Sequence, residues 1–134
     1  MGAPRPLPRL DSVNRPFWTG GAEGVLKIMR CQDCGTFLHP PRPVCRVCLS
    51  ENVAPEAVPG TGVVDTFTLN YQKWRPDMEV PFVIARIALD GAPGVFITSN
   101  VVNCPPESVD IGDRVRVTFL EQDDVHIPLF EKID

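Results

Sequence analysis

Alternating apolar and polar positions mark the second half of the chain. Five runs rich in β-branched residues are separated by turn residues, at 60–69, 82–89, 95–102, 115–120 and 126–130. Short, mostly antiparallel strands in this number are typical of a small Greek-key barrel of the OB type, although SH3-like barrels show a similar pattern. The glycines at 60 and 62 indicate the strong bend that a barrel strand needs. We therefore expect a mainly β protein in which residues 60–134 form a five-stranded OB-fold barrel.

The N-terminal residues lack this alternation. Residues 1–10 hold three prolines and no periodic pattern, which predicts an extended arm lying on a surface. One short helix is expected after the arm, with Asn14 as its N-cap, Pro16 in its first turn and the glycine pair at 20–21 as its end. The arm and the helix together make up a first segment, residues 1–24.

A second segment, residues 25–59, precedes the expected barrel. Residues 25–30 and 35–39 are apolar enough to form two short strands on either side of a turn. Residues 50–59 have little periodicity and contain two prolines, a composition typical of a hinge between modules.

Four cysteines supply the strongest motif in the chain. Cys31 and Cys34 form one C-x-x-C pair, and Cys45 and Cys48 form a second pair after ten intervening residues. Two such pairs on tight turns can place four thiolates at the corners of a tetrahedron, the geometry in which Zn²⁺ binds sulfur. Because four thiolates leave no open position for water or substrate, we expect one structural zinc ion in a zinc ribbon over residues 25–59.

Two other uses of these cysteines compete with zinc. A rubredoxin-like iron site has a similar four-thiolate geometry, and the cysteines could instead form disulfides. The ligand spacing favours zinc, with iron as the alternative, and reduced thiols favour a metal over disulfides. His39 lies between the two pairs, but four cysteines already complete the shell of a structural zinc.

Composition and charge narrow the range of functions. The 134 residues are 43% apolar and 22% charged, as in an ordinary folded domain. The net charge of −4 opposes binding to phosphate backbones, so we expect no nucleic-acid partner. A module that binds single-stranded nucleic acid is the alternative function, because zinc ribbons and OB barrels often serve that purpose. No apolar run suits a signal peptide or a membrane span, which predicts a cytoplasmic protein without a membrane partner.

The sequence contains no convincing catalytic constellation. Cys104 is the one thiol outside the four-cysteine motif, and no sequence neighbour would lower its pKa. His39 and His126 are the only histidines, and the paired acidic residues lie in expected turns. We expect no catalytic residue in this chain and no enzymatic activity of the chain by itself.

The order of several short motifs carries a resemblance to a known family. The motifs are Pro16-Phe-Trp18, Glu23-Gly-Val-Leu26, the four cysteines with Gly35 and Pro41-Arg-Pro43, Gly60-Thr-Gly-Val-Val64, Pro81-Phe-Val-Ile-Ala85 and Ile111-Gly-Asp-Arg-Val115. Taken together they resemble the DUF35 family, whose members pair a rubredoxin-like zinc ribbon with an OB-fold and are described as associated with acyl-CoA. The resemblance runs from residue 16 to the C-terminus.

This resemblance implies a companion of an enzyme. Family members accompany a thiolase-like subunit in acyl-CoA thiolases, polyketide-type acyltransferases and the aldolases that shorten steroid side chains. In the aldolases the module is also found fused to a MaoC-like hydratase subunit, where it binds a lipid-transfer-protein-like aldolase. The implied role is a non-catalytic subunit, or an excised module, that stabilises such a partner in a hetero-oligomer and shapes its acyl-CoA site. The acyl-CoA, the choice between thiolysis, condensation and retro-aldol cleavage, and the stoichiometry are properties of the partner.

Aromatic and basic residues supply candidate contacts to the partner or to CoA. The segment 71–76 joins the first two expected barrel strands, a position that OB folds use for ligands, and it concentrates residue types enriched in interfaces and phosphate sites. The alternatives are that Trp74 folds back on the barrel and that the aromatic pair at 17–18 packs on the protein body. The candidate contacts are Phe17, Trp18, Arg42, Tyr71, Lys73, Trp74 and Arg75.

Overall fold

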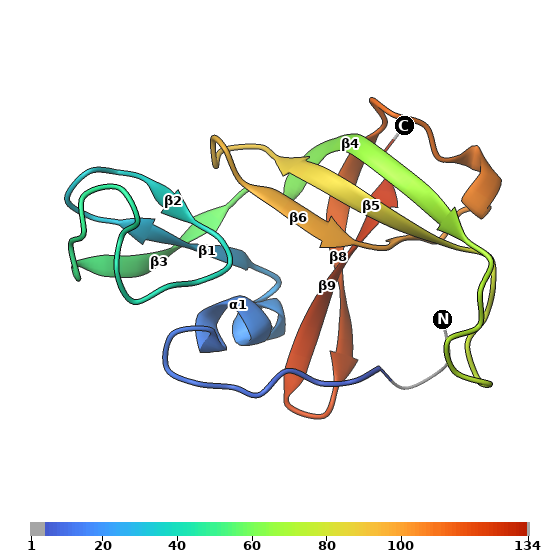
Figure 1. Cartoon of the computed structure of the whole chain (residues 1–134), viewed down its shortest axis with the longest axis horizontal. Coiled ribbons are helices and arrows are strands. Elements are labelled where there is room, and N and C mark those ends of the chain that lie inside the picture. Colours follow the sequence, from blue (N-terminus) through green and yellow to red (C-terminus); the bar gives the residue numbers. More distant parts are fainter. Residues whose placement is uncertain (1–4, 134) are drawn as a thin grey trace.

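The arm leads into two short helical turns at the junction of the molecule's two sheets (Figure 1). The computed structural model describes residues 5–133, so the first four residues of the expected arm lie outside the described residues. Helix α1 (Arg15–Thr19) continues directly into the 3₁₀-helix η1 (Gly20–Glu23). The α-helix ends at the glycine pair as expected, with Gly20 as its C-cap. The pair does not end all helical structure, because both glycines belong to η1, which Gly24 ends with a φ of 72°.

Asp11, rather than the expected cap Asn14, organises the start of α1. Asn14 has helical dihedral angles, and its side chain makes no capping hydrogen bond. Instead Asp11 Oδ1 accepts the backbone N–H groups of Val13 and Asn14, each at 2.8 Å. The Asn14 amide donates to the carbonyl of Arg9 and accepts from the N–H of Asp11. The side chain of Asn14 therefore ties the arm to the helix instead of capping it.

Strand β1 (Leu26–Cys31) forms the centre of the smaller sheet. It pairs antiparallel with β2 (Phe37–Leu38) on one side and with β3 (Val53–Val58) on the other. The two strands expected on either side of the first turn are confirmed. The expected hinge over residues 50–59 is wrong over β3, which pairs with β1 along its whole length. Pro55 fits within β3 because an edge strand has one side without a partner.

The larger sheet closes into a barrel. Its strands are β4 (Thr61–Asn70), β5 (Phe82–Leu89), β6 (Phe96–Ser99), β7 (Val101–Val102), β8 (Arg114–Gln122) and β9 (Val125–Lys132), with the 3₁₀-helix η2 (Pro106–Ser108) before β8. A bend at Asn100 splits one expected strand into β6, which pairs with β5, and β7, which pairs parallel with β9. Strand β4 pairs with β8 in the middle of the sheet, and β6 and β7 are its two ends, so the bent run 95–102 connects one end of the sheet to the other. The expected OB-fold is confirmed, with one of its five expected strands split into two.

Two glycines allow β4 to bend into the barrel. Gly60 has a φ of 79°, and a Cβ at this position would lie 2.8 Å from Cγ1 of Val117. A Cβ at Gly62 would lie 2.5 Å from the carbonyl oxygen of Ala88. The pairing of β4 with β5 then shifts its register between Val64 and Thr66, a bulge that increases the local twist.

One hydrophobic core joins the helix, the ribbon and the barrel. Phe17 of α1, Leu26 and Ile28 of β1 pack in the same cluster as barrel residues such as Ile87 and Phe130. The opposite face of β1 contributes to a second, smaller cluster around the cysteines. Ribbon and barrel are therefore held together by shared apolar packing. Among the described residues no helix is long and apolar enough to cross a membrane.

Candidate functional site

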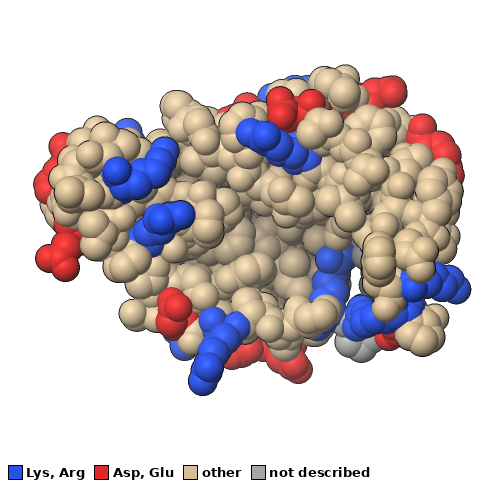
Figure 2. Space-filling view, in the orientation of Figure 1, with Lys and Arg blue, Asp and Glu red and all other residues tan. Residues whose placement is uncertain are grey.

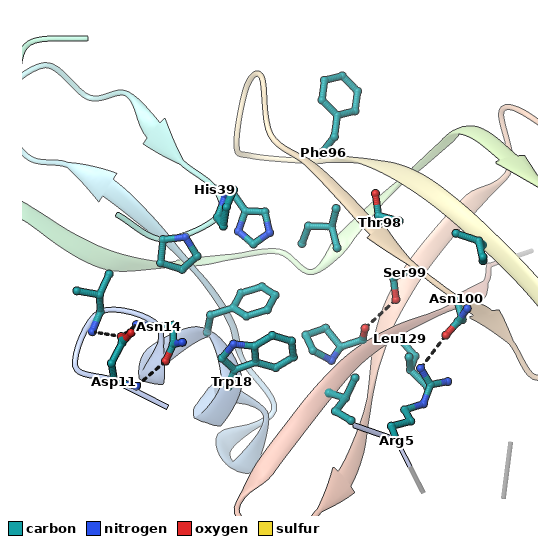
Figure 3. A pocket seen from close by; sticks show the side chains of 18 residues that line it. Arg5, Asp11, Asn14, Trp18, His39, Phe96, Thr98, Ser99, Asn100 and Leu129 are labelled. Atoms are coloured by element: carbon teal, nitrogen blue, oxygen red, sulfur yellow. Dashed lines mark hydrogen bonds between the residues drawn. The ribbon is translucent and has the colours of Figure 1, made fainter. Parts of the chain in front are cut away.

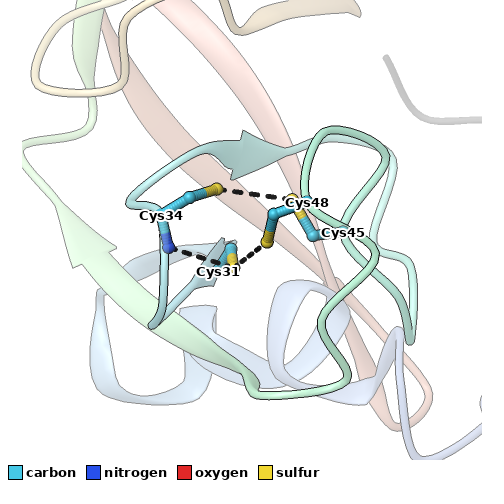
Figure 4. A group of neighbouring side chains, drawn as sticks. All are labelled: Cys31, Cys34, Cys45 and Cys48. Atoms are coloured by element: carbon cyan, nitrogen blue, oxygen red, sulfur yellow. Dashed lines mark hydrogen bonds between the residues drawn. The ribbon is translucent and has the colours of Figure 1, made fainter.

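The four cysteine sulfurs converge at the far end of the ribbon (Figure 4). All four Sγ atoms lie within 4.8 Å of one another, with Cys31 and Cys48 at 3.5 Å and Cys34 and Cys45 at 3.6 Å. Zinc bound to four sulfurs at about 2.3 Å requires S–S separations of about 3.8 Å in a tetrahedron. A disulfide requires about 2.05 Å, and these four cysteines are free. The cluster has the size of a zinc site and contains no disulfide.

The two turns that carry the cysteines have the same local design. The N–H of Gly35 donates to the carbonyl of Cys31, and the N–H of Leu49 donates to the carbonyl of Cys45, both at 3.0 Å. Backbone N–H groups also point at the sulfurs, from Cys34 to Cys31 Sγ at 3.5 Å and from Val47 to Cys45 Sγ at 3.4 Å. Such donors stabilise thiolates and orient them toward a metal.

The groups around the cysteine sulfurs shift the pKa values of Cys34 and Cys48 in opposite directions. Hydrogen bonding to Thr36, first through its hydroxyl group, lowers the pKa of Cys34 to about 6. At Cys48 the backbone N–H of Ser50 lowers the pKa, but the neighbouring thiols, led by Cys31, and burial together raise it to about 12. Four adjacent thiolates therefore need a compensating cation, which a divalent metal supplies. The donor set fits a closed, structural zinc site, and His39 is not part of the cluster.

A groove opens between the ribbon and the barrel, beside α1 (Figure 3). One cavity of about 690 Å³ lies between α1, residues 39–41, β6 and β9. A second cavity of about 540 Å³ adjoins it under the β4–β5 loop, and the two share Arg5, Trp18, Asn100 and Ile127. We call these two cavities together the groove. Figure 2 shows this face hollowed in its middle, with a floor of uncharged residues. Each cavity has the size of a small-molecule site.

The wall of the larger cavity is apolar and electrically neutral around His39. The imidazole ring lies 4.9 Å from the ring of Phe17, and its Nδ1 has no hydrogen-bond partner within the described part of the chain. Burial lowers the pKa of His39 to about 4, so the ring is neutral at physiological pH. Across the cavity, Ser99 uses its hydroxyl to donate to the carbonyl of Pro128 at 2.8 Å.

Arg5 lines both cavities. The side-chain amide of Gln122 accepts the N–H of Arg5 at 3.0 Å and donates to its carbonyl at 2.7 Å, which fixes the arm to the barrel. The guanidinium donates to Oδ1 of Asn100 at 2.8 Å, and the Asn100 amide donates to the carbonyl of Val83 at 2.7 Å. Burial, and then the charge of Arg75, lower the pKa of Arg5. Positive charge therefore gathers in the smaller cavity, whose lining includes one carboxylate, Glu79.

The structure distributes the seven predicted contact residues over four places. Phe17 is 6% exposed in the core, edge-on to Trp18 at 4.9 Å, and touches the groove only along its wall. Trp18, Trp74 and Arg75 line the groove. Tyr71 and Lys73 are exposed in the β4–β5 loop, and Arg42 is exposed on the ribbon. Trp74 is 72% exposed, and its Nε1 donates to Asn70 at 3.2 Å, so it does not fold into the barrel core.

Sequence reasoning missed two residues that shape the groove. Arg5 lies in an arm without any periodic pattern, and Asn100 interrupts a predicted strand. The one available signal was a polar residue inside the apolar run 95–102. The contact between Arg5 and Asn100 spans 95 positions of sequence, so it depends on the closed barrel.

Comparisons with known proteins agree with this architecture. Residues 18–54 match the family model for the rubredoxin-like zinc ribbon domain of ChsH2, and residues 55–120 match the model for its C-terminal OB-fold domain. A DUF35 domain-containing scaffold protein from Methanocaldococcus jannaschii is 34% identical over 68% of this chain and 64% of its own. The chain belongs to the DUF35 family. The match of the cysteine region to a zinc ribbon supports zinc and gives no support to iron.

Two further relatives of this DUF35 chain bear on its role. A probable enoyl-CoA hydratase alpha subunit from Thermomonospora curvata is 31% identical over 94% of the chain, which spans 39% of that protein. The chain thus spans less than two thirds of the length of these curated relatives. A solved structure described as the Ltp2-ChsH2(DUF35) aldolase superposes with a TM-score of 0.80 at 29% identity, covering 94% of this chain and 98% of that one.

Proposed function

We propose that this DUF35 chain is a non-catalytic accessory subunit or module that binds a lipid-transfer-protein-like aldolase of the thiolase fold. In this role it stabilises the partner and helps to shape the entrance of the partner's acyl-CoA site. The observation that carries the proposal is the superposition on the DUF35 chain of the Ltp2-ChsH2 aldolase, which extends over almost the full length of both chains. The scaffold and hydratase-subunit names of other relatives support the same class of role.

The groove supports the acyl-CoA part of this proposal. Its larger cavity is lined mainly by apolar side chains around a neutral His39, which suits an acyl chain or a steroid body. The smaller cavity brings Arg5 and Arg75 together, and guanidinium groups bind phosphates through paired hydrogen bonds. Lys73 lies in the same loop and adds a third positive charge.

The β4–β5 loop supports the partner-binding part. Tyr71 and Trp74 are 64% and 72% exposed, although large aromatic side chains are usually buried in part. Aromatic residues beside arginine are the residue types that most often dominate protein interfaces. We assign the reaction itself to the partner, because His39 makes no hydrogen bond to a carboxylate or hydroxyl among residues 5–133 that would prepare it for proton transfer.

Co-expression with an aldolase subunit of the Ltp2 type tests the proposal. We expect the two proteins to co-elute in size-exclusion chromatography, and retro-aldol cleavage of a steroid side-chain acyl-CoA to require both. Separate elution, together with full solubility and activity of the aldolase alone, would contradict it. Fluorescence anisotropy with labelled oligonucleotides at low salt tests the alternative, because tight, salt-sensitive binding would favour a nucleic-acid module.

A further inference from the structure

The second cysteine turn presents apolar side chains to solvent at the end of the ribbon. Val44, Val47 and Leu49 are 37%, 63% and 74% exposed, and they surround Cys45 and Cys48 in the sequence. We call these three residues the knuckle tip. They line neither cavity of the groove. Exposed valine and leucine on a turn this short gain little stability from burial, so folding alone does not account for them.

Leu49 also has an unfavourable backbone conformation. Its φ is 63°, in the left-handed region that a γ-branched side chain seldom adopts. The equivalent position of the first cysteine turn is Gly35, with a φ of 80° and the same closing hydrogen bond. Glycine would close the second turn without strain. The chain instead has a leucine whose side chain is three-quarters exposed, a combination that points to a contact with another molecule.

The charges beside the knuckle tip indicate what kind of surface fits it. Arg42 makes no hydrogen bond or ion pair among the described residues, and Arg46 donates only to the carbonyl of Phe37. Among the ribbon carboxylates, Asp33 accepts from Ser50 and Asn52, and Glu56 pairs with Arg30. Glu51 is exposed two positions after Leu49, so the two arginines outnumber the one acidic side chain that follows the turn. The tip is therefore apolar with a positive border, which matches an apolar socket edged by carboxylates.

The knuckle tip and the β4–β5 loop lie at opposite ends of the molecule, on either side of the groove. The ribbon turns lie at one end of the long axis and the β4–β5 loop at the other, with the groove between them (Figure 1, Figure 3). A protein that covers the groove and reaches the loop can extend along the long axis of the molecule to the tip (Figure 1). The four cysteines hold the turn rigid, so binding through it would cost little conformational entropy.

We propose that the knuckle tip is a second docking site for the aldolase subunit, with Leu49 as its anchor in an apolar socket edged by Asp or Glu. This inference rests on the function proposed above, and it adds a contact that is separate from the β4–β5 loop. Two-point attachment would fix the orientation of the partner over the groove, which a contact at the loop alone cannot do.

The test uses the Ltp2 protein of the solved complex as the probe and measures its Kd for the full chain. Leu49→Gly removes the side chain and suits the left-handed backbone, whereas Leu49→Ser removes the apolar surface and keeps the strain. We expect each variant to weaken binding about tenfold or more. Zinc content should stay at the wild-type value, and the Tm of Leu49→Gly should equal or exceed that of the wild type. Arg42→Glu should weaken binding and reduce its salt dependence.

Ile111→Ser is the matched control, because Ile111 is 68% exposed in a loop before β8 and belongs to neither proposed contact. It should leave the Kd within about twofold of the wild type. If wild type and Leu49→Gly bind equally well, or if Ile111→Ser weakens binding as much, the docking site is wrong while the proposed function stands. If the wild-type chain does not bind the aldolase subunit at all, both proposals are wrong.

Discussion

The Nδ1 atom of the half-buried His39 is buried without a hydrogen-bond partner among residues 5–133, and this affects the stability of the folded chain. The unfolded chain should protonate this imidazole near its ordinary pKa of 6.5, whereas the folded chain protonates it only near 4. Between these values the unfolded state binds more protons, so the free energy of unfolding must fall as the pH decreases. We expect a loss of up to about 2 kcal/mol between pH 7 and pH 5, measured by denaturant titration with saturating zinc.

The variant His39→Gln isolates this contribution. Its side chain is neutral at every pH in the window, so the part of the pH dependence that comes from His39 should disappear. Protonation of the cysteines affects both proteins alike and cancels in the difference. An unchanged slope of stability against pH in the variant would show that His39 is not the group responsible.

The sequence could predict the roles of residues whose partners lie nearby in the chain. The cysteine spacing alone predicts that the four sulfurs lie together, because each pair lies on one tight turn. A set of four thiolate ligands in turn predicts zinc. The role of Arg5 could not be predicted, because its partners Asn100 and Gln122 are 95 and 117 positions away. Asn14 shows the same limit over a shorter distance, since its side chain bonds the backbone of Arg9 and Asp11 in the arm instead of the first turn of the helix.

At the level of single elements, the ribbon depends on its metal. Cys45 is fully buried, and Cys45→Ser removes one of the four ligands. We expect the zinc content to fall from one ion per chain toward zero and the chain to lose several kcal/mol of stability, because metal binding and folding of such ribbons are coupled. Metal analysis by mass spectrometry and thermal unfolding followed by circular dichroism measure the two effects.

Cys104→Ser is the matched control for that variant. It also exchanges one thiol for a hydroxyl, but Cys104 lies beside the barrel core and outside the cysteine cluster. Zinc content should be unchanged, and any loss of stability should be about 1 kcal/mol or less. Equal loss of zinc from both variants would contradict the assignment of the metal ligands.

The arm is a second element whose attachment can be tested. Gln122 makes two hydrogen bonds to the main chain of Arg5, so Gln122→Ala should loosen the arm while leaving the barrel folded. Limited digestion with trypsin should then cleave after Arg9 several times faster than in the wild type. Gln72→Ala, in the exposed β4–β5 loop, serves as the control. Equal cleavage rates in Gln122→Ala and the wild type would mean that this clamp does not hold the arm.

Elements with a strong internal pattern were predicted, and elements defined by their partners were not. The five expected barrel runs alternate in sequence, and each of them forms a strand, although the run 95–102 is divided at Asn100 into β6 and β7. Strand β3 contains Pro55 and little alternation, and it becomes a strand because β1 offers a free edge along its whole length. Tertiary pairing outweighed local propensity there.

At the scale of the whole molecule, the shared core decides how the ribbon can influence the groove. Leu26 and Ile28 of β1 pack into the barrel core, while the next residues of the strand face the cysteines. The groove lies where these two parts meet, between residues 39–41 and strands β6 and β9. A metal that fixes the ribbon therefore also fixes one wall of the groove, although it lies at the far end of the ribbon.

The exposed aromatic rim of the groove gives the last prediction, which concerns assembly of the whole complex. Trp74 buries little surface in the isolated chain, so Trp74→Ala should change its free energy of unfolding by less than about 1 kcal/mol. At an interface the same ring would be an anchor, and its loss should weaken binding of the aldolase subunit by about 2 kcal/mol or more. Isothermal titration calorimetry with the purified subunit measures the second effect. Ile111→Ala is a suitable comparison, because Ile111 is 68% exposed and lies outside the groove and the β4–β5 loop. If Trp74→Ala binds the subunit as tightly as the wild type, the loop is not the primary contact, and the knuckle tip would have to carry the attachment alone.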